Sequence, residues 1–502
     1  MKPTLTFTPP PHRPGLALAL LASVLLSACA SLALPGAALP ETPTPAAWSG
    51  AATPAATGQT TTDLARWWQR FNDPTLTALV TEALQANTSV KSAQAALLQA
   101  RAQRDVQQAG MGPSVSASGS ARRGKSGGND ASNSFQTGFD ASWEPDVFGG
   151  NRAALNASEA DVQASATSLA NVQVSLAAEV AVTTIELRGL QTRLAIARRN
   201  LTAQTETLQI TRWRGQAGLA SSLDVEQAVA ASEQTAAQIP ALQTSITQAL
   251  NSLAVLTGQA PGALQDRLAT AAPVPQAPAD LALALPADTL RQRPDVRTAE
   301  YRVSAALARV AQADAARYPS FRLSGSLGLS ALTLGALTNG ASVANSLLAS
   351  VSVPLLDGGA ARAQVRSQEA ALEQARLGYQ AAVLTALKDV EDALVSLQGN
   401  RERLARLQAA SEAAANAELL ARQRYESGLI DFRTVLDTQR TLLSTQDSVA
   451  STQASLSADM VRLYKTLGGG WAGPGDTNTA ATTAAAHARP ADGLTSSPLT
   501  DR

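Results

Sequence analysis

Side chains that could carry out covalent chemistry are scarce in this sequence of 502 residues. It contains two histidines, His12 and His487, and one cysteine, Cys29. A disulfide needs two cysteines, and a structural zinc site needs about four gathered Cys or His ligands. A catalytic triad would have to use a histidine from a segment near one chain end, and neither segment has the composition of a folded core. We therefore do not expect an enzyme.

One stretch matches a phosphate-binding loop letter by letter. The run Gly119-Ser120-Ala121-Arg122-Arg123-Gly124-Lys125-Ser126 fits the pattern G-x-x-x-x-G-K-[ST]. A working loop of this kind follows a buried hydrophobic strand and opens a helix. Here a Ser-alternating segment precedes the motif, and Gly127-Gly128-Asn129-Asp130 follows it, which starts a helix poorly. The pattern favours a polar hairpin loop over a nucleotide site.

The overall charge excludes another class of function. The chain has 40 Lys and Arg against 40 Asp and Glu, so its formal charge is zero. A nucleic-acid partner normally requires a basic excess or a basic patch. We expect no nucleic-acid partner.

The cysteine follows a targeting segment. Gly15 to Ser27 is an apolar run of 13 residues, which is shorter than the roughly 20 residues of a membrane-spanning helix. It fits the hydrophobic region of a secretory signal. The run ends in Leu26-Ser27-Ala28-Cys29, which resembles a bacterial lipobox, where cleavage precedes the cysteine and its thiol takes a lipid such as palmitate. The alternative is an ordinary signal peptide with an incidental cysteine.

The lipobox reading divides the N-terminal region. Residues 1–28 are expected to be the signal peptide, and residues 29–62, rich in Ala, Pro and Thr, a lipid-anchored linker. The lipid on Cys29 would be the only bound group, with no other cofactor and no metal. In the sorting rule that accompanies the lipobox, Asp after the cysteine retains a protein in the inner membrane. Ala30 stands there instead, which implies the outer membrane.

The rest of the chain consists of two similar halves followed by a tail. Pro113 to Ser120 recurs as Pro319 to Ser326 at an offset of 206, and Gly149, Arg152 and Gly218 recur as Gly359, Arg362 and Gly428 at an offset of 210. This pattern predicts a duplicated unit of about 200 residues. We place the first repeat at 63–265 and the second at 266–471. Residues 472–502 are of low complexity and are expected to be disordered.

Each half predicts one very long helix and a returning helix. The long helices are expected at about 151–214 and 360–427, each preceded by a shorter helix at about 76–109 or 295–317. Pro240 is expected to kink or break the first returning helix. Apolar residues recur every seven positions, which is a coiled-coil seam: Val180, Leu187, Leu194, Leu201 and Leu208, and then Val383, Val390, Leu397 and Leu404.

Four short segments alternate with a period of two instead. We expect strands at about 113–122, 134–144, 319–330 and 345–355. In the second, Phe135, Phe139 and Trp143 share one face, while Gln136, Asp140 and Glu144 share the other. About ten residues of such alternation are typical of a transmembrane β-strand. The alternative is a soluble four-stranded sheet with one dry face. The alternating segments argue against the long soluble coiled coil that the seam by itself would allow.

Four strands cannot close a barrel, and open sheet edges are not tolerated in lipid. The chain should therefore form oligomers. A dimer would give eight strands, whose interior is filled by side chains. A trimer would give twelve, wide enough for a water-filled lumen, and higher numbers stay possible.

Several motifs in a fixed order resemble the bacterial outer-membrane factor family, the TolC/OprM-like channels, and its NodT-type lipoprotein branch. They are Trp67 to Leu76 (WWQRFNDPTL), Trp143 to Gly149 (WEPDVFG), Arg293 to Val296 (RPDV), Leu355 to Gly359 (LLDGG) and Tyr464 to Trp471 (YKTLGGGW). The resemblance implies a mainly α-helical protomer with a transmembrane β part. Three copies would form a 12-stranded outer-membrane barrel, continued by a periplasmic α-helical barrel.

The resemblance also implies function, partners and sites. The chain would conduct small molecules or drugs passively outward, together with a periplasmic adaptor and an inner-membrane resistance–nodulation–division transporter. The family's closed gate would fall on Asp437 and Arg440, with Arg433 in place of an apolar constriction residue. The two helix–helix turns would contact the adaptor, through Gly218, Leu219 and Ser221 and through Gly428, Leu429 and Asp431. We expect Gly218 and Gly428 to take the positive φ that ends a helix.

Two other functions stay open. One is the outer-membrane duct of a type I protein-secretion system, and the other is a non-conducting structural lipoprotein of the envelope. The lipobox and the Gly-Gly-Gly-Trp ending favour small-molecule efflux over secretion. The alternating strands argue against a purely structural role.

Overall fold

The structure is a computed structural model that describes residues 64–125, 130–276 and 293–471, together with the single residues 39, 48, 127 and 290. The expected signal peptide, Cys29 and the tail 472–502 lie outside the described residues, as does nearly all of the linker. Every element below belongs to one unit, Pro40–Arg502. In chain order they are η1 (Trp67–Phe71), α3 (Pro74–Ala86), α4 (Thr88–Ala109), β1 (Ser114–Gly124), β2 (Ser132–Trp143), α5 (Gly150–Gln216), α6 (Ser222–Leu256), α7 (Gln265–Leu268), α9 (Pro294–Ala315), β3 (Ser320–Ala331), η2 (Leu334–Ala336), η3 (Gly340–Ser342), β4 (Val343–Ser352), α10 (Ala360–Glu426) and α11 (Phe432–Thr466).

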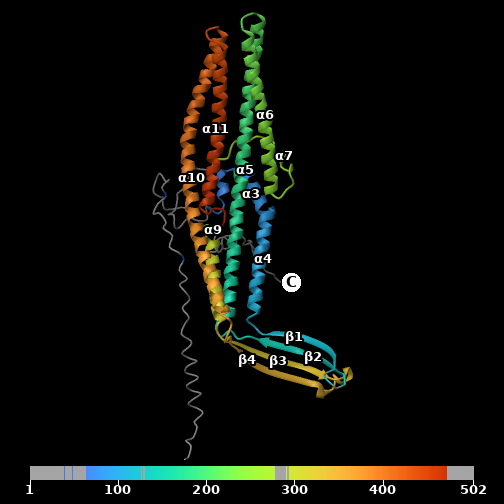
Figure 1. Cartoon of the computed structure of the whole chain (residues 1–502). Coiled ribbons are helices and arrows are strands. Elements are labelled where there is room, and N and C mark those ends of the chain that lie inside the picture. Colours follow the sequence, from blue (N-terminus) through green and yellow to red (C-terminus); the bar gives the residue numbers. More distant parts are fainter. Residues whose placement is uncertain are drawn as a thin grey trace, which may run out of the picture. The chain divides into compact units, whose positions relative to one another are not determined.

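The helices stand side by side as four columns (Figure 1). Near the sheet the neighbours are α4, α5, α9 and α10, in that order; further away they are α6, α5, α11 and α10. The helices α5 and α10, of 67 residues each, run through both levels and would be roughly 100 Å long at about 1.5 Å per residue. The shorter helices share the remaining two columns. In one column α6 is stacked end to end with α4, and in the other α11 is stacked end to end with α9.

A side chain joins the two parts of the first shared column. The Asn87 amide donates to the backbone oxygen of Leu256 at the end of α6, 2.9 Å away. Its side-chain oxygen accepts from the Ser89 nitrogen at 2.8 Å and caps α4. This cap divides the segment expected as one helix at 76–109 into α3 and α4, so that expectation is wrong. An N-cap residue has an extended backbone, which ends one helix and begins the next.

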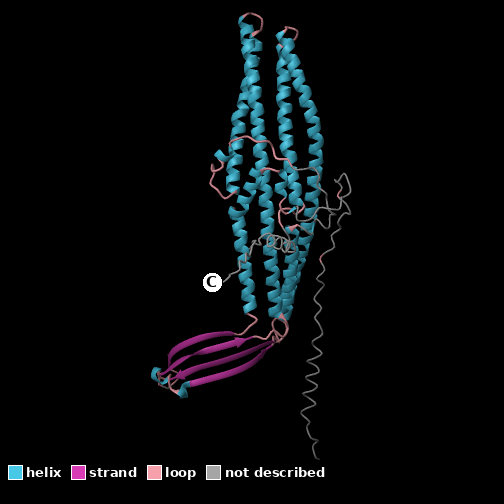
Figure 2. Cartoon of the chain, turned by 180° about the vertical axis from the view of Figure 1, so that it is seen from behind, coloured by secondary structure: helices cyan, strands magenta, loops and turns pink. Residues whose placement is uncertain are grey.

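The strands form one antiparallel sheet in the order β1-β2-β3-β4 (Figure 2). The register places Ala117 opposite Phe139, Phe139 opposite Leu327, and Leu327 opposite Asn345. Since side chains alternate between faces, most apolar side chains of the four strands share one face, which also carries Asn345, while Leu348 of β4 lies on the other. Ser118, Asp140 and Ser326 share the other, where the Ser118 hydroxyl donates to the Asp140 carboxylate at 2.9 Å. The sheet is two-sided, as the alternation predicts.

Two strand-level expectations change in detail. The strand expected to reach residue 355 ends at Ser352, because Pro354 has no N–H to donate to a neighbouring strand. Gly119 to Gly124 of the phosphate-loop motif lie inside β1 rather than in a hairpin loop, and the next element is β2. Among the described residues, β1 is therefore followed by another strand and not by the helix that a nucleotide site needs.

Pro240 does not break α6, which continues from Ser222 to Leu256. Proline removes one backbone donor from the middle of the helix. The helix keeps its remaining turns, and the Thr244 hydroxyl donates to the Pro240 oxygen at 2.9 Å. Packing against α5 along its length explains why the helix is not interrupted.

The main core lies where the four columns change partners. It gathers side chains from η1, α3, α5, α6, α10 and α11. Trp67 is fully buried at its centre and stacks on Tyr464, with ring centroids 5.5 Å apart. The helix α5 contains an 18-residue window apolar enough to cross a membrane by composition, with half of that window buried inside the chain. Such a composition suits a helix with neighbours on several sides.

A glycine pair fixes the distance between β2 and β3. Gly138 lies opposite Gly328, and a Cβ built on Gly138 would stand 2.7 Å from the Gly328 Cα. We expect Gly138→Val to weaken this strand pair by about 1–3 kcal/mol, the usual cost of overpacking, and to lower the temperature at which the folded protein unfolds in detergent. Gly119→Val in β1 is the matched control, because nothing lies within 4 Å of its Cβ position. Equal effects of both substitutions would contradict the prediction.

Candidate functional site

The two helix–helix turns at the far end from the sheet have the same geometry. Gly218 has φ +71° and Gly428 has φ +73°, so the expected positive φ is confirmed at both. The backbone nitrogen of Leu219 donates to the Arg214 oxygen at 2.7 Å, and that of Leu429 donates to the Arg424 oxygen at 2.8 Å. These are the bonds of a helix end that closes on a left-handed glycine.

Two of the residues expected to contact an adaptor begin the returning helices. Ser221 caps α6 and forms a reciprocal capping box with Asp224. Asp431 caps α11, and its carboxylate accepts from the Thr434 nitrogen at 3.0 Å. Hydrogen bonds from the Thr434 hydroxyl and backbone nitrogen lower the pKa of Asp431. Both side chains therefore hold the turns in shape.

Leu219 and Leu429, the leucines after the two glycines, do not cap a helix. Leu219 is 71% exposed and Leu429 is 74% exposed. They occupy equivalent positions in the two repeats, and each projects from the outermost turn of its hairpin. Exposed apolar side chains on well-defined turns are suited to contact another protein.

The three expected gate residues form one charged row at the start of α11. Asp437 lies between two arginines: its carboxylate is 4.0 Å from the Arg433 Nε and 3.9 Å from the Arg440 Nη1. The three side chains are 81%, 61% and 54% exposed, for Arg433, Asp437 and Arg440 respectively. Contacts this long and exposed stabilise a single chain little, so the charges remain available to another copy.

Sequence reasoning missed a contact that joins the two hairpins at their tips. The Arg214 guanidinium donates to the backbone oxygen of Tyr425 at 2.9 Å and lies 4.4 Å from the centroid of its ring. Tyr425 also packs on Phe432, with centroids 5.4 Å apart. The aromatic residues on both sides of the second turn were the available sign of this cluster.

Far from the tips, an ion cluster around the buried Arg293 guanidinium joins α9, α10 and α11. The Arg293 guanidinium donates to Asp295 at 2.7 Å, to Asp389 at 3.2 Å and to the backbone oxygen of Thr466 at 3.1 Å. Burial by itself would raise the pKa of Asp295. The hydrogen bonds and positive charge of Arg293 outweigh burial and hold that pKa below its ordinary value.

This cluster predicts a loss of stability in acid. Because the pKa of Asp295 is lower in the folded chain, the stabilisation is present in full above the ordinary value near 4. It is lost as the pH falls from there through the lower folded value. We expect thermal stability to fall with acidification over that window, and Asp295→Asn to make the fall shallower. Glu300→Gln, an exposed position on the same helix, should leave the pH profile unchanged; the same change in both variants would contradict the assignment.

Comparison with known proteins identifies the class. A family model described as outer membrane efflux protein matches residues 79–259 and 285–469. The outer membrane protein OprJ of Pseudomonas aeruginosa is 31% identical, over 90% of this chain and 95% of the relative. Nodulation protein T of Rhizobium leguminosarum bv. trifolii is 30% identical, over 83% and 89%. The structure of the outer-membrane channel OprN superposes with a TM-score of 0.78 at 35% identity, over 87% of this chain and 100% of that one.

The fold is thus that of an outer-membrane export channel, with a β part and a long helical part. The chain belongs to the outer membrane efflux protein family. The expected family, fold class, outer-membrane location and role in efflux are confirmed. The relatives are named as channels and efflux proteins rather than enzymes.

Proposed function

We propose that three copies of the chain close into one continuous duct that conducts small molecules from the periplasm to the exterior. The observation that supports this most is that each edge strand of the sheet is connected directly to an edge helix of the helical part. The edge strand β1 follows the edge helix α4, and the edge strand β4 precedes the edge helix α10. One rotation that joins β4 to the next copy's β1 therefore also brings α10 beside the next copy's α4. A closed ring removes open strand edges, which lipid does not tolerate.

The different chemistry of the two sheet faces indicates which face would turn outward when the barrel closes. The apolar face includes Val115 at 68%, Leu347 at 79% and Val351 at 63% exposure in the single chain. Lipid is the partner that such a face needs. The face with Ser118, Asp140 and Ser326 would line a water-filled lumen. Conduction through it is passive and needs no covalent step by the protein.

The energy for transport would come from partners. We propose that a periplasmic adaptor and an inner-membrane transporter of the resistance–nodulation–division type deliver solute at the hairpin tips. The exposed leucines on the rigid turns, Leu219 and Leu429, are the adaptor contacts, while Gly218, Ser221, Gly428 and Asp431 set their positions. In this proposal the lipid on Cys29 anchors the chain in the outer membrane.

The row of Arg433, Asp437 and Arg440 would act as the gate. Three copies bring three such rows around one axis. Asp437 of one copy can then exchange its long contacts within α11 for shorter ones to an arginine of the neighbouring copy. Opening must break several of these contacts together, and docking of the adaptor at the tips would supply the free energy.

The turns yield a direct prediction. Leu219→Asp combined with Leu429→Asp should leave the folded trimer intact and reduce adaptor capture several-fold, because two exposed apolar contacts become charged. Co-purification with the adaptor after cross-linking measures this. Leu355→Asp, a 91% exposed leucine far from the tips, is the control, and equal capture by all variants would show that the turns are not the contact surface.

The function itself is tested in a deletion strain. Its growth is measured across antibiotics, dyes, detergents and metal ions, and its secreted proteins are analysed in parallel. We expect sensitisation that the wild-type gene reverses. Unchanged sensitivity with one protein missing from the medium would instead indicate type I secretion.

A further inference from the structure

Three basic side chains lie together at the end of the sheet that is farther from the helices. They are Arg122 and Arg123 near the end of β1, and Lys125 directly after the strand. All three residues are exposed. Within the described residues none of them forms an ion pair, not even with Asp130 before β2. We call these three residues the basic cluster, and its positive charge is available to a partner outside the chain.

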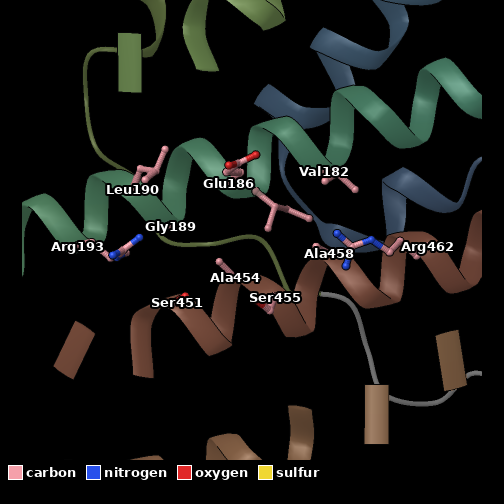
Figure 3. Close-up of a pocket in the computed structure, with 11 residues that line it drawn as sticks. Val182, Glu186, Gly189, Leu190, Arg193, Ser451, Ala454, Ser455, Ala458 and Arg462 are labelled. Carbon is pink, nitrogen blue, oxygen red and sulfur yellow. The ribbon is translucent and has the colours of Figure 1, made fainter. Parts of the chain in front are cut away.

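Two arginines of the helical part show the contrast. Figure 3 shows Arg193 and Arg462 at opposite ends of a groove of about 290 Å3 between α5 and α11. Arg193 is ion-paired with Asp447 at 2.7 Å, and Arg462 is ion-paired with Asp459 at 2.7 Å. Both positive charges of the groove are therefore neutralised within the chain, whereas those of the basic cluster are not.

Alternation places Arg123 on the apolar face of the sheet. Val115 and Ala117 of β1 lie on that face, and Arg123 continues the same series of odd-numbered residues. Arg122 lies on the other face with Ser118, the face that would line the lumen. The two neighbouring arginines would therefore have different surroundings: the membrane for Arg123 and the aqueous duct for Arg122.

The length of the strands places Arg123 at the surface of the membrane. Arg123 pairs with Asn133 of β2, and Trp143 at the other end of β2 is on the same face, ten residues along. Ten residues of an antiparallel strand cover about 34 Å, or roughly 24–28 Å across the bilayer at the usual tilt of about 35–45°. The apolar band of such a barrel is about 25 Å tall. Since tryptophan is typical of a membrane interface, Trp143 would lie at the inner interface and Arg123 at the outer one.

The outer interface is rich in phosphate. The outer leaflet of a bacterial outer membrane is built from a glycolipid whose sugar head carries phosphate groups. Anionic head groups attract basic side chains at the membrane surface, and a guanidinium group can bind a phosphate through two parallel hydrogen bonds. A basic side chain costs much less free energy at this level than at the middle of the bilayer. The chemistry of the leaflet therefore matches that of the basic cluster.

The neighbouring copy in the proposed ring would leave this charge in place. The edge strand β1 would pair with β4 of the next copy. Residues 323–356 contain β4 and the loop before it, and they include no Asp, Glu, Lys or Arg. Ring closure therefore brings no carboxylate from this segment to the basic cluster.

We propose that Arg123 and Lys125 bind the phosphate groups of the outer-leaflet glycolipid. Ala121 and Phe135 form the next residue pair on the same face, closer to the middle of the membrane, and would contact the acyl chains of the same lipid. Three copies would hold such lipids at three positions around the outer rim of the barrel. This inference rests on the proposed trimeric barrel.

Native mass spectrometry of the purified trimer tests the proposal by counting bound lipid. The wild-type trimer is mixed with phosphorylated lipid A, or with the same lipid A after removal of its phosphates. Each basic side chain near an anionic surface strengthens binding about fivefold. We therefore expect Arg123→Gln/Lys125→Gln to weaken binding of phosphorylated lipid A roughly 25-fold. The wild-type trimer should bind the dephosphorylated lipid as weakly, and inorganic phosphate at the same concentration should displace no lipid.

A matched pair of single variants separates the two faces of the strand. Arg123→Gln should weaken binding about fivefold, whereas Arg122→Gln removes the same charge from the lumen face and should bind like the wild type. Equal binding by these two variants, or equal binding of the two lipid forms by the wild type, would overturn the proposal. Displacement by inorganic phosphate would overturn the lipid as the ligand. Cross-linking of the same preparations reports the trimer, so that a wild-type chain without trimers would contradict the proposed function instead.

Discussion

Cells that carry Asp437→Ala/Arg440→Ala are expected to admit large antibiotics that the wild-type outer membrane excludes. The substitutions remove two of the three charged side chains that each copy would present around the tip and leave Arg433. An exposed ion pair contributes only about 0.2–1 kcal/mol, but three pairs that break together act on one equilibrium. The open fraction should rise by roughly tenfold, since about 1.4 kcal/mol corresponds to that factor. Susceptibility to vancomycin measures it in whole cells.

The control for the gate is an ion pair of similar exposure away from the tips. Lys388 and Asp392 on α10 lie 2.6 Å apart, with side chains 69% and 64% exposed. Lys388→Ala/Asp392→Ala should leave vancomycin susceptibility at the wild-type level. Equal sensitisation by both double variants would indicate a general defect of the envelope and would contradict the gate.

The second large effect is expected from Trp67→Ala. Trp67 is fully buried and contacts three aromatic rings, with centroids 5.7 Å away for Trp68, 6.0 Å for Phe71 and 5.5 Å for Tyr464. Removing a buried tryptophan from a core costs about 3–5 kcal/mol, a large share of the roughly 5–15 kcal/mol that stabilises a typical domain. The helical part should unfold at a temperature lower by at least several degrees.

Circular dichroism of the purified protein during heating measures this loss. Trp213→Ala is the matched control, because Trp213 is 60% exposed near the tip and its removal leaves no internal cavity. An unfolding temperature for Trp67→Ala within a degree of the control would contradict the assignment of Trp67 as the centre of the core.

Local patterns in the sequence predicted most of the elements. Strands show a period of two and coiled-coil helices a period of seven, so both could be found without a structure. Val180, Leu187 and Leu208 of the expected seam are buried, as are Val383, Val390 and Leu397. The faces of the strands also follow directly from alternation. The division at Asn87 was missed because a capping side chain interrupts a helix without changing its apolar pattern.

Contacts between distant segments could not be predicted in the same way. Arg193, Asn200, Thr207 and Arg214 form a row of polar residues on α5, next to the expected seam at Leu194, Leu201 and Leu208, and they contact α10 and α11. In sequence it is indistinguishable from a solvated helix face. Its partners are between 211 and 254 positions away, and only the folded arrangement of two repeats brings them together. The Arg214–Tyr425 contact was missed for the same reason.

The functional residues fall into the same two groups: some follow from a local sequence pattern, and others depend on contacts between distant segments or between copies. The glycines of the turns could be predicted, because a helix end with positive φ has a local sequence pattern. The gate residues came from resemblance alone, and their opposing contacts would lie on other copies of the chain. A row of charges at one end of a helix acquires a role only through the symmetry of an assembly.

Conductance of the purified protein in planar lipid bilayers tests the central claim most directly. A trimeric duct with a charged gate predicts discrete channels of small conductance for the wild-type chain, and openings several-fold larger for Asp437→Ala/Arg440→Ala. The absence of channels from both proteins, when both are folded and inserted, would contradict the claim that the chain forms a conducting duct.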